Sequence, residues 1–267
     1  MPTHHPVPTD APVPVDAPVP ADVPVPTDVP VPVDAPVPVD APVPVDLLIL
    51  AGGRGARLGG RDKAALVVGG RSLLERLVQD VDLGGAVVVV GRTTLPPSGT
   101  GRTLLQTLED PPDGGPVAGI AAGLDALAEG GRGAEQSSDW VAVAAVDQPE
   151  AARALASLAA ELAHVDDDVE AVSPLDATGH RQWLLALYRR TALERALVAL
   201  PDVRDTSVRR LVTDLRWHEV DVEAQHLGDV DTWEDMEDWA QRVAHDERHR
   251  VLLTGGGCDP GPADRRV

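Results

Sequence analysis

The sequence predicts an α/β domain in which helices cover both faces of a mostly parallel sheet. From residue 47 onward, short apolar runs alternate with longer stretches whose apolar residues recur at helical spacing. The runs are continuously apolar, which is typical of strands that are buried on both faces of a parallel sheet. A glycine-rich segment directly follows the first run, at the position where such sheets carry their ligand-binding loops.

The individual elements are predicted from local signals. The run at 47–50 has the length of a buried strand, and the glycine cluster after it ends that strand. Ser72 can cap a helix, and Glu75 three residues later completes a capping box. The expected strands are 47–50, 86–90, 140–146, 169–173, 184–187 and 217–222, and the expected helices are 73–81, 117–128, 150–164, 191–200, 207–215 and 233–244.

The first 46 residues differ in composition from the rest of the chain. Seven consecutive hexapeptides of the form x-P-V-P-x-D fill residues 5–46, and residues 1–46 hold 15 of the 25 prolines. Proline at this density excludes helix and sheet and favours an extended polyproline II conformation. We interpret the repeats as a disordered spacer or solubilising arm. There are two alternatives: the repeats are a ligand for a proline-binding partner, or they are upstream codons wrongly read as coding. The predicted division is therefore 1–46 arm, 47–250 domain and 251–267 disordered tail.

Charge and cysteine content exclude several classes of protein. The formal net charge is −20, and residues 1–46 contribute only seven of the 43 acidic residues, so the domain itself is acidic. An acidic domain argues against a broad nucleic-acid or anionic-membrane surface. Cys258 is the only cysteine, which excludes an internal disulfide framework and a cysteine metal cluster. Without a 20-residue apolar stretch or a signal-like start, the expectation is a soluble cytoplasmic protein.

The segment from Leu50 to Lys63 is the first candidate site. Its glycines remove Cβ atoms, so that backbone amides can face a phosphate chain, and its three arginines and one lysine supply positive charge. Lys63 is the only lysine in the chain, against 22 arginines. A single lysine in a chain that otherwise uses arginine indicates a position that needs a compact ammonium, for which the planar guanidinium does not substitute. The segment therefore predicts phosphate binding; a glycine-rich turn with solvated charges is the alternative.

Two aspartates are candidate metal ligands. Asp147 directly follows the third apolar run, and a carboxylate at the carboxyl end of a strand faces the ligand crevice of such a sheet. The alternative role of Asp147 is the N-cap of the next helix. Asp231 precedes the last predicted helix, which Asp231 or Thr232 could cap, or Asp231 could be a second metal ligand.

These motifs together resemble one enzyme family. L-A-G-G-R-G-A-R-L-G-G-R-D-K at 50–63 resembles the N-terminal signature of the molybdenum cofactor guanylyltransferases, which make molybdopterin guanine dinucleotide. Further matches follow in order: G-R-S-L-L at 70–74, E-D at 109–110 before G-P-V-A-G at 115–119, D-Q-P at 147–149, L-A-L-Y-R at 185–189, D-T-S-V-R-R-L at 205–211 and D-V-D-T-W-E-D at 229–235. The resemblance covers about 47–243. The chain departs from the pattern at Gly91, where the family has asparagine, at Asp231, where some members have asparagine, and at Trp183 and Trp233, where proline is usual.

The resemblance implies a three-layer α/β/α, Rossmann-like nucleotidyltransferase domain that joins GMP from GTP to the phosphate of molybdopterin and releases pyrophosphate. It implies Mg²⁺ as the cofactor, with Asp147 as its ligand and Asp231 as a second candidate. The catalytic residues implied are Lys63, Arg57 and Asp147, and the nucleotide-binding residues implied are Leu50, Ala51, Gly52, Gly53, Lys63, Asp110 and Asp147. GTP and molybdopterin are the expected substrates, and cofactor-insertion proteins or acceptor molybdoenzymes are the expected partners. The protein is expected to be a monomer that binds neither nucleic acid nor membrane.

Other members of the superfamily are the alternatives. Cytidylyltransferases for the same cofactor typically read L-A-A-G where this chain reads L-A-G-G, which favours guanine. A deazaflavin-precursor guanylyltransferase, a sugar-phosphate nucleotidyltransferase and a non-catalytic nucleotide-binding relative also remain open. The presence of both Lys63 and Asp147 argues against the last of these, because a non-catalytic copy needs neither.

Overall fold

In the part of the chain that the structure describes, the central sheet has seven strands. The computed structural model describes residues 42–52, 62–97, 101–130 and 138–254, with side chains described as far as residue 243. The chain divides into two units, Met1–Ala41 and Pro42–Val267, and all described residues belong to the second. Within the described residues the order of strands in the sheet is β5-β4-β1-β6-β8-β7-β9. The strands are β1 Val45–Leu50, β4 Gly84–Val90, β5 Leu104–Thr107, β6 Trp140–Ala145, β7 Ala171–Pro174, β8 Leu185–Arg189 and β9 Trp217–Val220.

Six of these strands run in the same direction. β5, β4, β1 and β6 pair in parallel, as do β7 and β9, whereas β8 pairs antiparallel to both β6 and β7. The prediction of a mostly parallel sheet is therefore confirmed. Because β1 lies between β4 and β6, the carboxyl ends of these three strands meet at one edge of the sheet.

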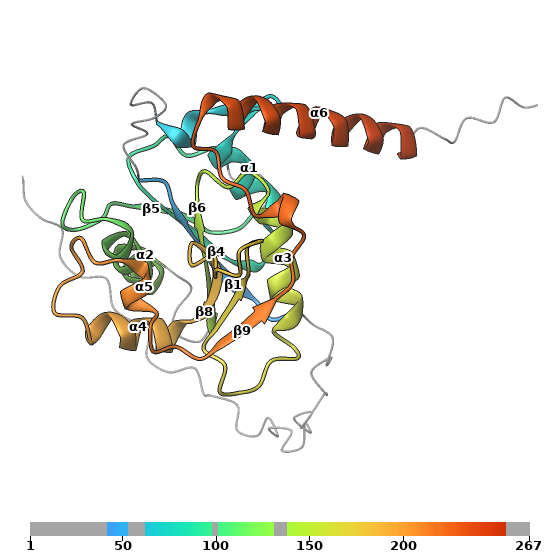
Figure 1. Ribbon diagram of the computed structural model, residues 1–267. Helices are drawn as coiled ribbons and strands as arrows, with labels where there is room; N and C mark the ends of the chain where they lie inside the picture. The colour runs from blue at the N-terminus through green and yellow to red at the C-terminus, as the bar shows by residue number, and fades with distance from the viewer. Residues whose placement is uncertain (1–41, 53–61, 98–100, 131–137, 255–267) are drawn as a thin grey trace, which may run out of the picture. The chain divides into compact units, whose positions relative to one another are not determined.

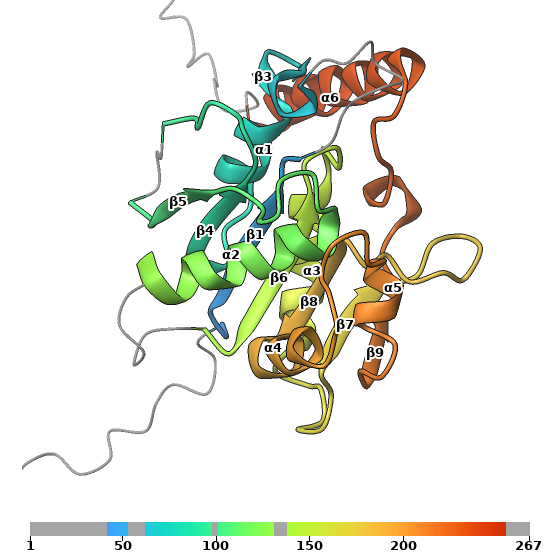
Figure 2. The same ribbon diagram turned by 90° about the vertical axis from the view of Figure 1, so that its left-hand side faces the viewer.

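Helices cover both faces of the sheet and make it three-layered. Leu47 and Ile49 of β1 pack into one core with α1 (Leu73–Asp80), α3 (Ala151–Glu161) and α6 (Trp233–Thr254). Leu48 and Leu50 point to the opposite face and pack into a second core with α2 (Pro116–Gly130), α4 (Arg190–Val198) and α5 (Val208–Leu211). Figure 2 shows α2 and α4 on the near face of the sheet, and Figure 1 shows α3 on the other side. None of the described helices has both the length and the apolar character needed to cross a membrane.

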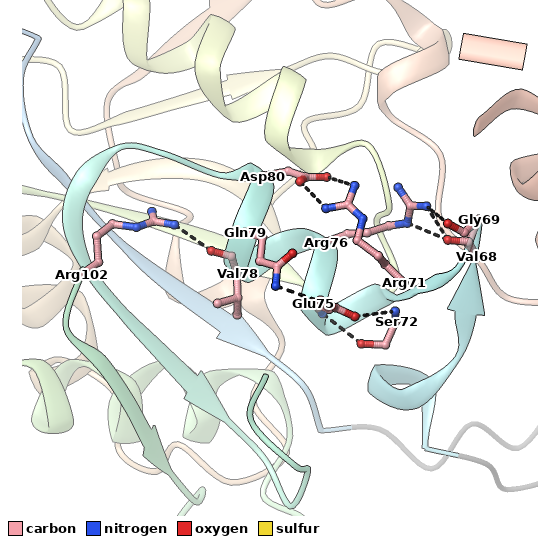
Figure 3. Close-up of polar contacts among 10 residues, drawn as sticks. All are labelled: Val68, Gly69, Arg71, Ser72, Glu75, Arg76, Val78, Gln79, Asp80 and Arg102. Atoms are coloured by element: carbon pink, nitrogen blue, oxygen red, sulfur yellow. Dashed lines mark hydrogen bonds and ion pairs between the residues drawn. The ribbon is translucent and has the colours of Figure 1, made fainter. Parts of the chain in front are cut away.

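Polar contacts fix α1 to the segments around it (Figure 3). The predicted capping box is present: the Glu75 amide donates to the Ser72 hydroxyl at 3.1 Å, and the Ser72 amide donates to Glu75 at 3.4 Å. A short hairpin of β2 (Val67–Val68) and β3 (Arg71–Ser72) precedes the helix, and Nε of the buried Arg76 donates to the Val68 carbonyl at 2.9 Å. These contacts hold the chain between Lys63 and α1 in one arrangement.

The domain begins two residues earlier than the sequence suggested. Val45 and Asp46, the last two residues of the seventh hexapeptide, form the start of β1. Asp46 is buried, accepts a hydrogen bond from the Ala86 amide at 2.7 Å, and pairs with Arg190 at 2.5 Å. The seventh aspartate is therefore part of the fold. At the other end, α6 continues to Thr254, so residues 251–254 are helical rather than part of the predicted tail.

Truncation at two positions should separate the arm from the domain. Deleting residues 1–41 should leave the melting temperature nearly unchanged, because Met1–Ala41 forms a separate unit. Deleting residues 1–46 should lower the melting temperature by roughly 10 °C, since it leaves the Arg190 side chain, which is only 11% exposed, without its carboxylate, a loss of about 3–5 kcal/mol. Asp46→Ala in the full chain should reproduce most of this effect in thermal unfolding. Equal melting temperatures for the two truncated proteins would contradict a structural role for Asp46.

Candidate active site

A large cleft lies at the carboxyl ends of β1, β4 and β6. Its volume is about 1420 Å³. Each of these strands contributes its last residues to the wall, α2 contributes Pro116 and Gly119 of its first turn, and Gly115 lies just before that helix. This is the edge at which open α/β sheets bind their ligands.

One cluster of opposite charges joins three distant parts of the chain in this cleft. The Lys63 ammonium donates to Oδ2 of Asp147 at 2.7 Å and to Oδ1 of Asp231 at 2.8 Å. Lys63 comes from the short 3-10 helix η2 (Lys63–Ala65), Asp147 follows β6, and Asp231 precedes α6. The side chain of Lys63 is only 16% exposed, so its charge is largely removed from water and depends on the two carboxylates.

Backbone contacts explain how Asp231 reaches this cluster. The amide of the fully buried Val230 donates to the Asp147 carbonyl at 2.8 Å, which joins the two aspartate-bearing loops directly. The start of α6 is closed by Thr232 and Asp235: the Asp235 carboxylate accepts from the Thr232 amide at 2.7 Å, and the Asp235 amide donates to the Thr232 hydroxyl at 3.2 Å. Thr232 therefore serves the helix end, and the Asp231 side chain faces the lysine.

Asp147 is likewise not used as a helix cap. The N-cap position of α3 is occupied by Glu150. The described hydrogen bond of the Asp147 side chain goes to Lys63 instead. The helix-cap role is therefore not seen, Asp147 lines the cleft, and its role as a metal ligand stays a prediction.

The electrostatics of the cluster favour a bound cation. Burial alone would lower the pKa of the Lys63 ammonium, but its hydrogen bonds and attraction to Asp147 and Asp231 outweigh burial and raise that pKa. Burial and repulsion from the same two carboxylates raise the pKa of the neighbouring Asp229 carboxyl. Lys63 therefore stays charged throughout the physiological range, beside a surplus of negative charge.

Asp229 should destabilise the domain at neutral pH. The pKa of Asp229 in the folded protein lies above its usual value of 3.8. As the pH rises, the carboxyl therefore loses its proton in the unfolded state before it does so in the folded state. Above the pKa of the unfolded state, Asp229 increasingly lowers the free energy of unfolding. Asp229→Asn should raise the melting temperature at pH 7 by roughly 2 °C, since Asp229 is partly solvated, and by progressively less as the pH falls toward 4. Thermal unfolding of both proteins between pH 4 and pH 8 measures this difference. A gain that is independent of pH would contradict charge repulsion as its cause.

Gly91 lies where the chains of β1 and β4 approach each other at the floor of the cleft. A Cβ atom at this position would lie 2.9 Å from the Ala51 carbonyl carbon and 3.1 Å from the Gly52 amide nitrogen. The φ angle of Gly91 is 149°. The asparagine that the resemblance leads one to expect at this position would therefore require the first loop to move. The neighbouring Arg92 also lines the cleft.

The structure brings most of the predicted site residues together. Leu50, Ala51, Gly52, Lys63, Asp110, Asp147 and Asp231 all line the cleft. Gly53 and Arg57 lie outside the described residues. Within the first of these segments, residues 50–52, the Ala51 amide donates to the Val90 carbonyl at 2.8 Å. The Ala51 amide is therefore already paired, and a phosphate at this end of β1 would need other donors.

Other residues that line the cleft were not predicted. Arg92 follows β4 just as Asp147 follows β6, so its position after an apolar run could have identified it. Asp113 and Asp205 have positive φ values of 55° and 53°, and the Asp205 amide donates to the Gly114 carbonyl at 2.9 Å. No sequence pattern indicates this contact, because it joins two turns that are far apart in the chain.

Comparison with known proteins identifies the domain. The family model described as the MobA-like NTP transferase domain matches residues 47–220, which is more than half of the chain. The chain belongs to this family. The resemblance inferred from the sequence motifs is thereby confirmed, and the MobA-like domain is a nucleotidyltransferase with the expected fold.

Curated relatives of this MobA-like protein carry one activity in their names. A molybdenum cofactor guanylyltransferase of Rhodopseudomonas palustris is 33% identical over 166 residues, which cover 59% of this chain and 72% of the relative. A probable molybdenum cofactor guanylyltransferase of Opitutus terrae is 34% identical over 182 residues, which cover 63% of this chain and 85% of the relative. The match therefore extends over most of each relative.

Solved structures of low sequence identity share the fold. Molybdopterin-guanine dinucleotide biosynthesis protein A from Archaeoglobus fulgidus has a TM-score of 0.51 at 21% identity and covers 75% of this chain and 100% of its own. The 4-diphosphocytidyl-2C-methyl-D-erythritol synthase from Anaerococcus prevotii has a TM-score of 0.52 at 14% identity and covers 75% of this chain and 96% of its own. The MobA-like fold is therefore shared by enzymes whose names indicate different bases, and fold alone does not select guanine.

The donor set of the cluster suits a hard divalent cation. Among the described residues, no group of three or more His, Cys, Asp or Glu side chains is arranged to hold a metal ion. Mg²⁺ does not require such a group, because it is usually bound by one or two carboxylates together with substrate phosphates and water. Asp147 and Asp231 are two carboxylates that face a single cation, the Lys63 ammonium.

Proposed function

We propose that this protein transfers GMP from GTP to the phosphate of molybdopterin, forming the guanine dinucleotide and pyrophosphate. The observation that carries the proposal is the Lys63–Asp147–Asp231 cluster in the cleft of a MobA-like domain. The names of the curated relatives support guanine and molybdopterin as substrates. In this proposal the acceptors of the dinucleotide are molybdoenzymes.

The reaction needs no nucleophile from the protein. A phosphate oxygen of molybdopterin attacks the α-phosphorus of GTP, the bond from that phosphorus to the α,β-bridging oxygen breaks, and pyrophosphate leaves with the bond electrons. The protein must position the two phosphates and neutralise the charge that builds up on them. The cleft accordingly contains a partly buried ammonium and no serine or cysteine among its described lining residues.

Each described residue of the cluster has a role in this scheme. The Lys63 ammonium would donate to non-bridging phosphate oxygens, and the wall around Gly52 would hold the triphosphate against the end of β1. Asp147 and Asp231 would hold Mg²⁺, which would supply further positive charge to the triphosphate when bound. Asp110 lies at the rim of the same cleft and would contact the nucleoside part of GTP.

Selective stabilisation by GTP tests the choice of base. GTP with Mg²⁺ at about 100 times its dissociation constant should raise the melting temperature by roughly 5–10 °C, because the ligand binds only the folded state. CTP, ATP and UTP at the same concentration should raise it by less. The measurement is thermal unfolding with each nucleotide, with and without Mg²⁺. Equal shifts for all four would contradict a guanylyltransferase, and a larger shift with CTP would favour a cytidylyltransferase.

A further inference from the structure

We infer that Lys63 is the resident counter-ion of the Asp147–Asp231 pair, and that a divalent cation must displace the lysine in order to bind there. The inference rests on the proposed function, since it concerns the metal site assigned there. It adds a coupling: arrival of the metal releases the ammonium, which can then reach the phosphates of the nucleotide. Lysine and metal would thus occupy the carboxylate pair in turn rather than together.

The Lys63 ammonium and a metal ion would compete for one position between the two carboxylates. The ammonium lies 2.7 Å from one carboxylate and 2.8 Å from the other, so it occupies the position of a cation shared by the two. A Mg²⁺ ion binds carboxylate oxygens at about 2.0–2.1 Å and would have to lie in the same region. Two cations cannot occupy this region without close repulsion in a partly buried site. Binding of the metal between Asp147 and Asp231 therefore requires that Lys63 leave.

The Lys63 side chain has room to move within the cleft when it leaves the aspartates. Lys63 itself lines the cleft, so rotation of its four-carbon side chain can carry the ammonium away from the aspartates without moving the backbone. A released ammonium that is mostly buried needs a new anionic partner. The phosphates of the nucleotide would supply that partner, so metal and nucleotide should bind cooperatively and the metal alone should bind weakly.

Asp147 and Asp231 together hold the Lys63 ammonium strongly. Asp231 contributes a full negative charge to the pair, whereas an asparagine at this position would accept a hydrogen bond from Lys63 and attract its charge much more weakly. The contact between the Val230 amide and the Asp147 carbonyl keeps the two carboxylates at a separation that one ammonium spans. The pair is therefore pre-assembled around a single cation.

Metal binding without nucleotide tests the competition. Mn²⁺ titrations of the full chain, followed by the electron paramagnetic resonance signal of free Mn²⁺, should show at least tenfold tighter binding for Lys63→Met than for the wild type. Arg71→Met is the matched control: it removes a positive charge from the exposed pair with Asp80, shown in Figure 3, and should stay within twofold of the wild type. Adding Asp231→Asn to Lys63→Met should reverse the gain. Unchanged or weaker Mn²⁺ binding by Lys63→Met would overturn the inference.

A second measurement needs no substitution, so it does not depend on whether Lys63→Met folds. Because Lys63 is the only lysine, protein grown with lysine labelled with ¹³C at Cε gives a single lysine resonance. Titration with Mg²⁺ should move this resonance in a saturable manner, and Mg²⁺ with GTP should move it further and at lower Mg²⁺ concentration. No movement at Mg²⁺ concentrations that saturate the site would overturn the inference. The metal-only steps use neither GTP nor molybdopterin, so they can succeed even where the proposed activity fails.

Discussion

Replacing Lys63 with alanine should lower the rate of GMP transfer by about 100-fold, the usual loss when one preorganised donor to a developing charge is removed. The reason is that Lys63 is the one cation in the described part of the Asp147–Asp231 cluster, and the proposed reaction depends on neutralising charge on the phosphate chain. The measurement is the steady-state rate of pyrophosphate release with GTP, Mg²⁺ and molybdopterin. Lys63→Arg should recover only part of the rate, because the planar guanidinium is larger and differently directed.

Arg71→Met again provides the control for loss of a positive charge, since Arg71 pairs with Asp80 and does not line the cleft. Its rate should match that of the wild type. A Lys63→Ala protein that retains the wild-type rate, with its fold intact by circular dichroism, would remove Lys63 from the reaction.

Replacing Asp147 with alanine should have the larger effect, a loss of about 1000-fold in kcat. The substitution removes a proposed metal ligand and leaves the partly buried Lys63 with Asp231 alone among the described carboxylate partners. The rate should recover only partly as the Mg²⁺ concentration is raised, because the remaining carboxylate cannot orient the metal by itself. Rates measured across a range of Mg²⁺ concentrations test this expectation.

Asp167→Ala is the matched control for Asp147→Ala, since Asp167 lies exposed in the turn after α3. It should leave both kcat and the Mg²⁺ requirement unchanged. Full recovery of Asp147→Ala at high Mg²⁺ would assign Asp147 to metal affinity alone, whereas an unchanged rate at all concentrations would exclude it from the site.

The parts of the fold that could be predicted are those whose signals are local. β1, β4 and β6 were identified because strands buried on both faces are apolar without interruption, and the start of α1 because Ser72 and Glu75 form a capping box. β5 was missed because it is an edge strand, half-buried and interrupted by Gln106. The antiparallel direction of β8 could not be predicted, since an apolar run does not indicate which way it pairs.

The start of the domain could not be predicted for a related reason. The hexapeptide A-P-V-P-V-D occurs at 11–16, 35–40 and 41–46, so its three copies are locally identical. What distinguishes Asp46 is its ion pair with Arg190, 144 residues further along the chain. Only the assembled fold shows which copy belongs to the domain.

In the candidate site, composition and position in the sequence identified individual residues, but the sequence did not show which of these residues contact each other. Lys63 was identified as the only lysine, and Asp147 by its place at the end of an apolar run. Asp231 was left between a metal ligand and a helix cap, because its contact with Lys63 spans 168 residues and its neighbour Thr232 satisfies the helix end. Asp205 begins one of the family motifs, but neither it nor Asp113 was predicted to line the cleft, since the two turns that carry them meet only in the folded domain.

The most direct test of the proposed function is to look for the product. The full chain should be incubated with molybdopterin, GTP carrying a labelled α-phosphate, and Mg²⁺, and the products separated by chromatography. The proposal predicts molybdopterin guanine dinucleotide that carries the label, with one pyrophosphate released for each dinucleotide formed, and no product with labelled CTP at the same concentration. Absence of labelled dinucleotide under conditions in which GTP and Mg²⁺ stabilise the protein, or efficient transfer from CTP instead, would contradict the account.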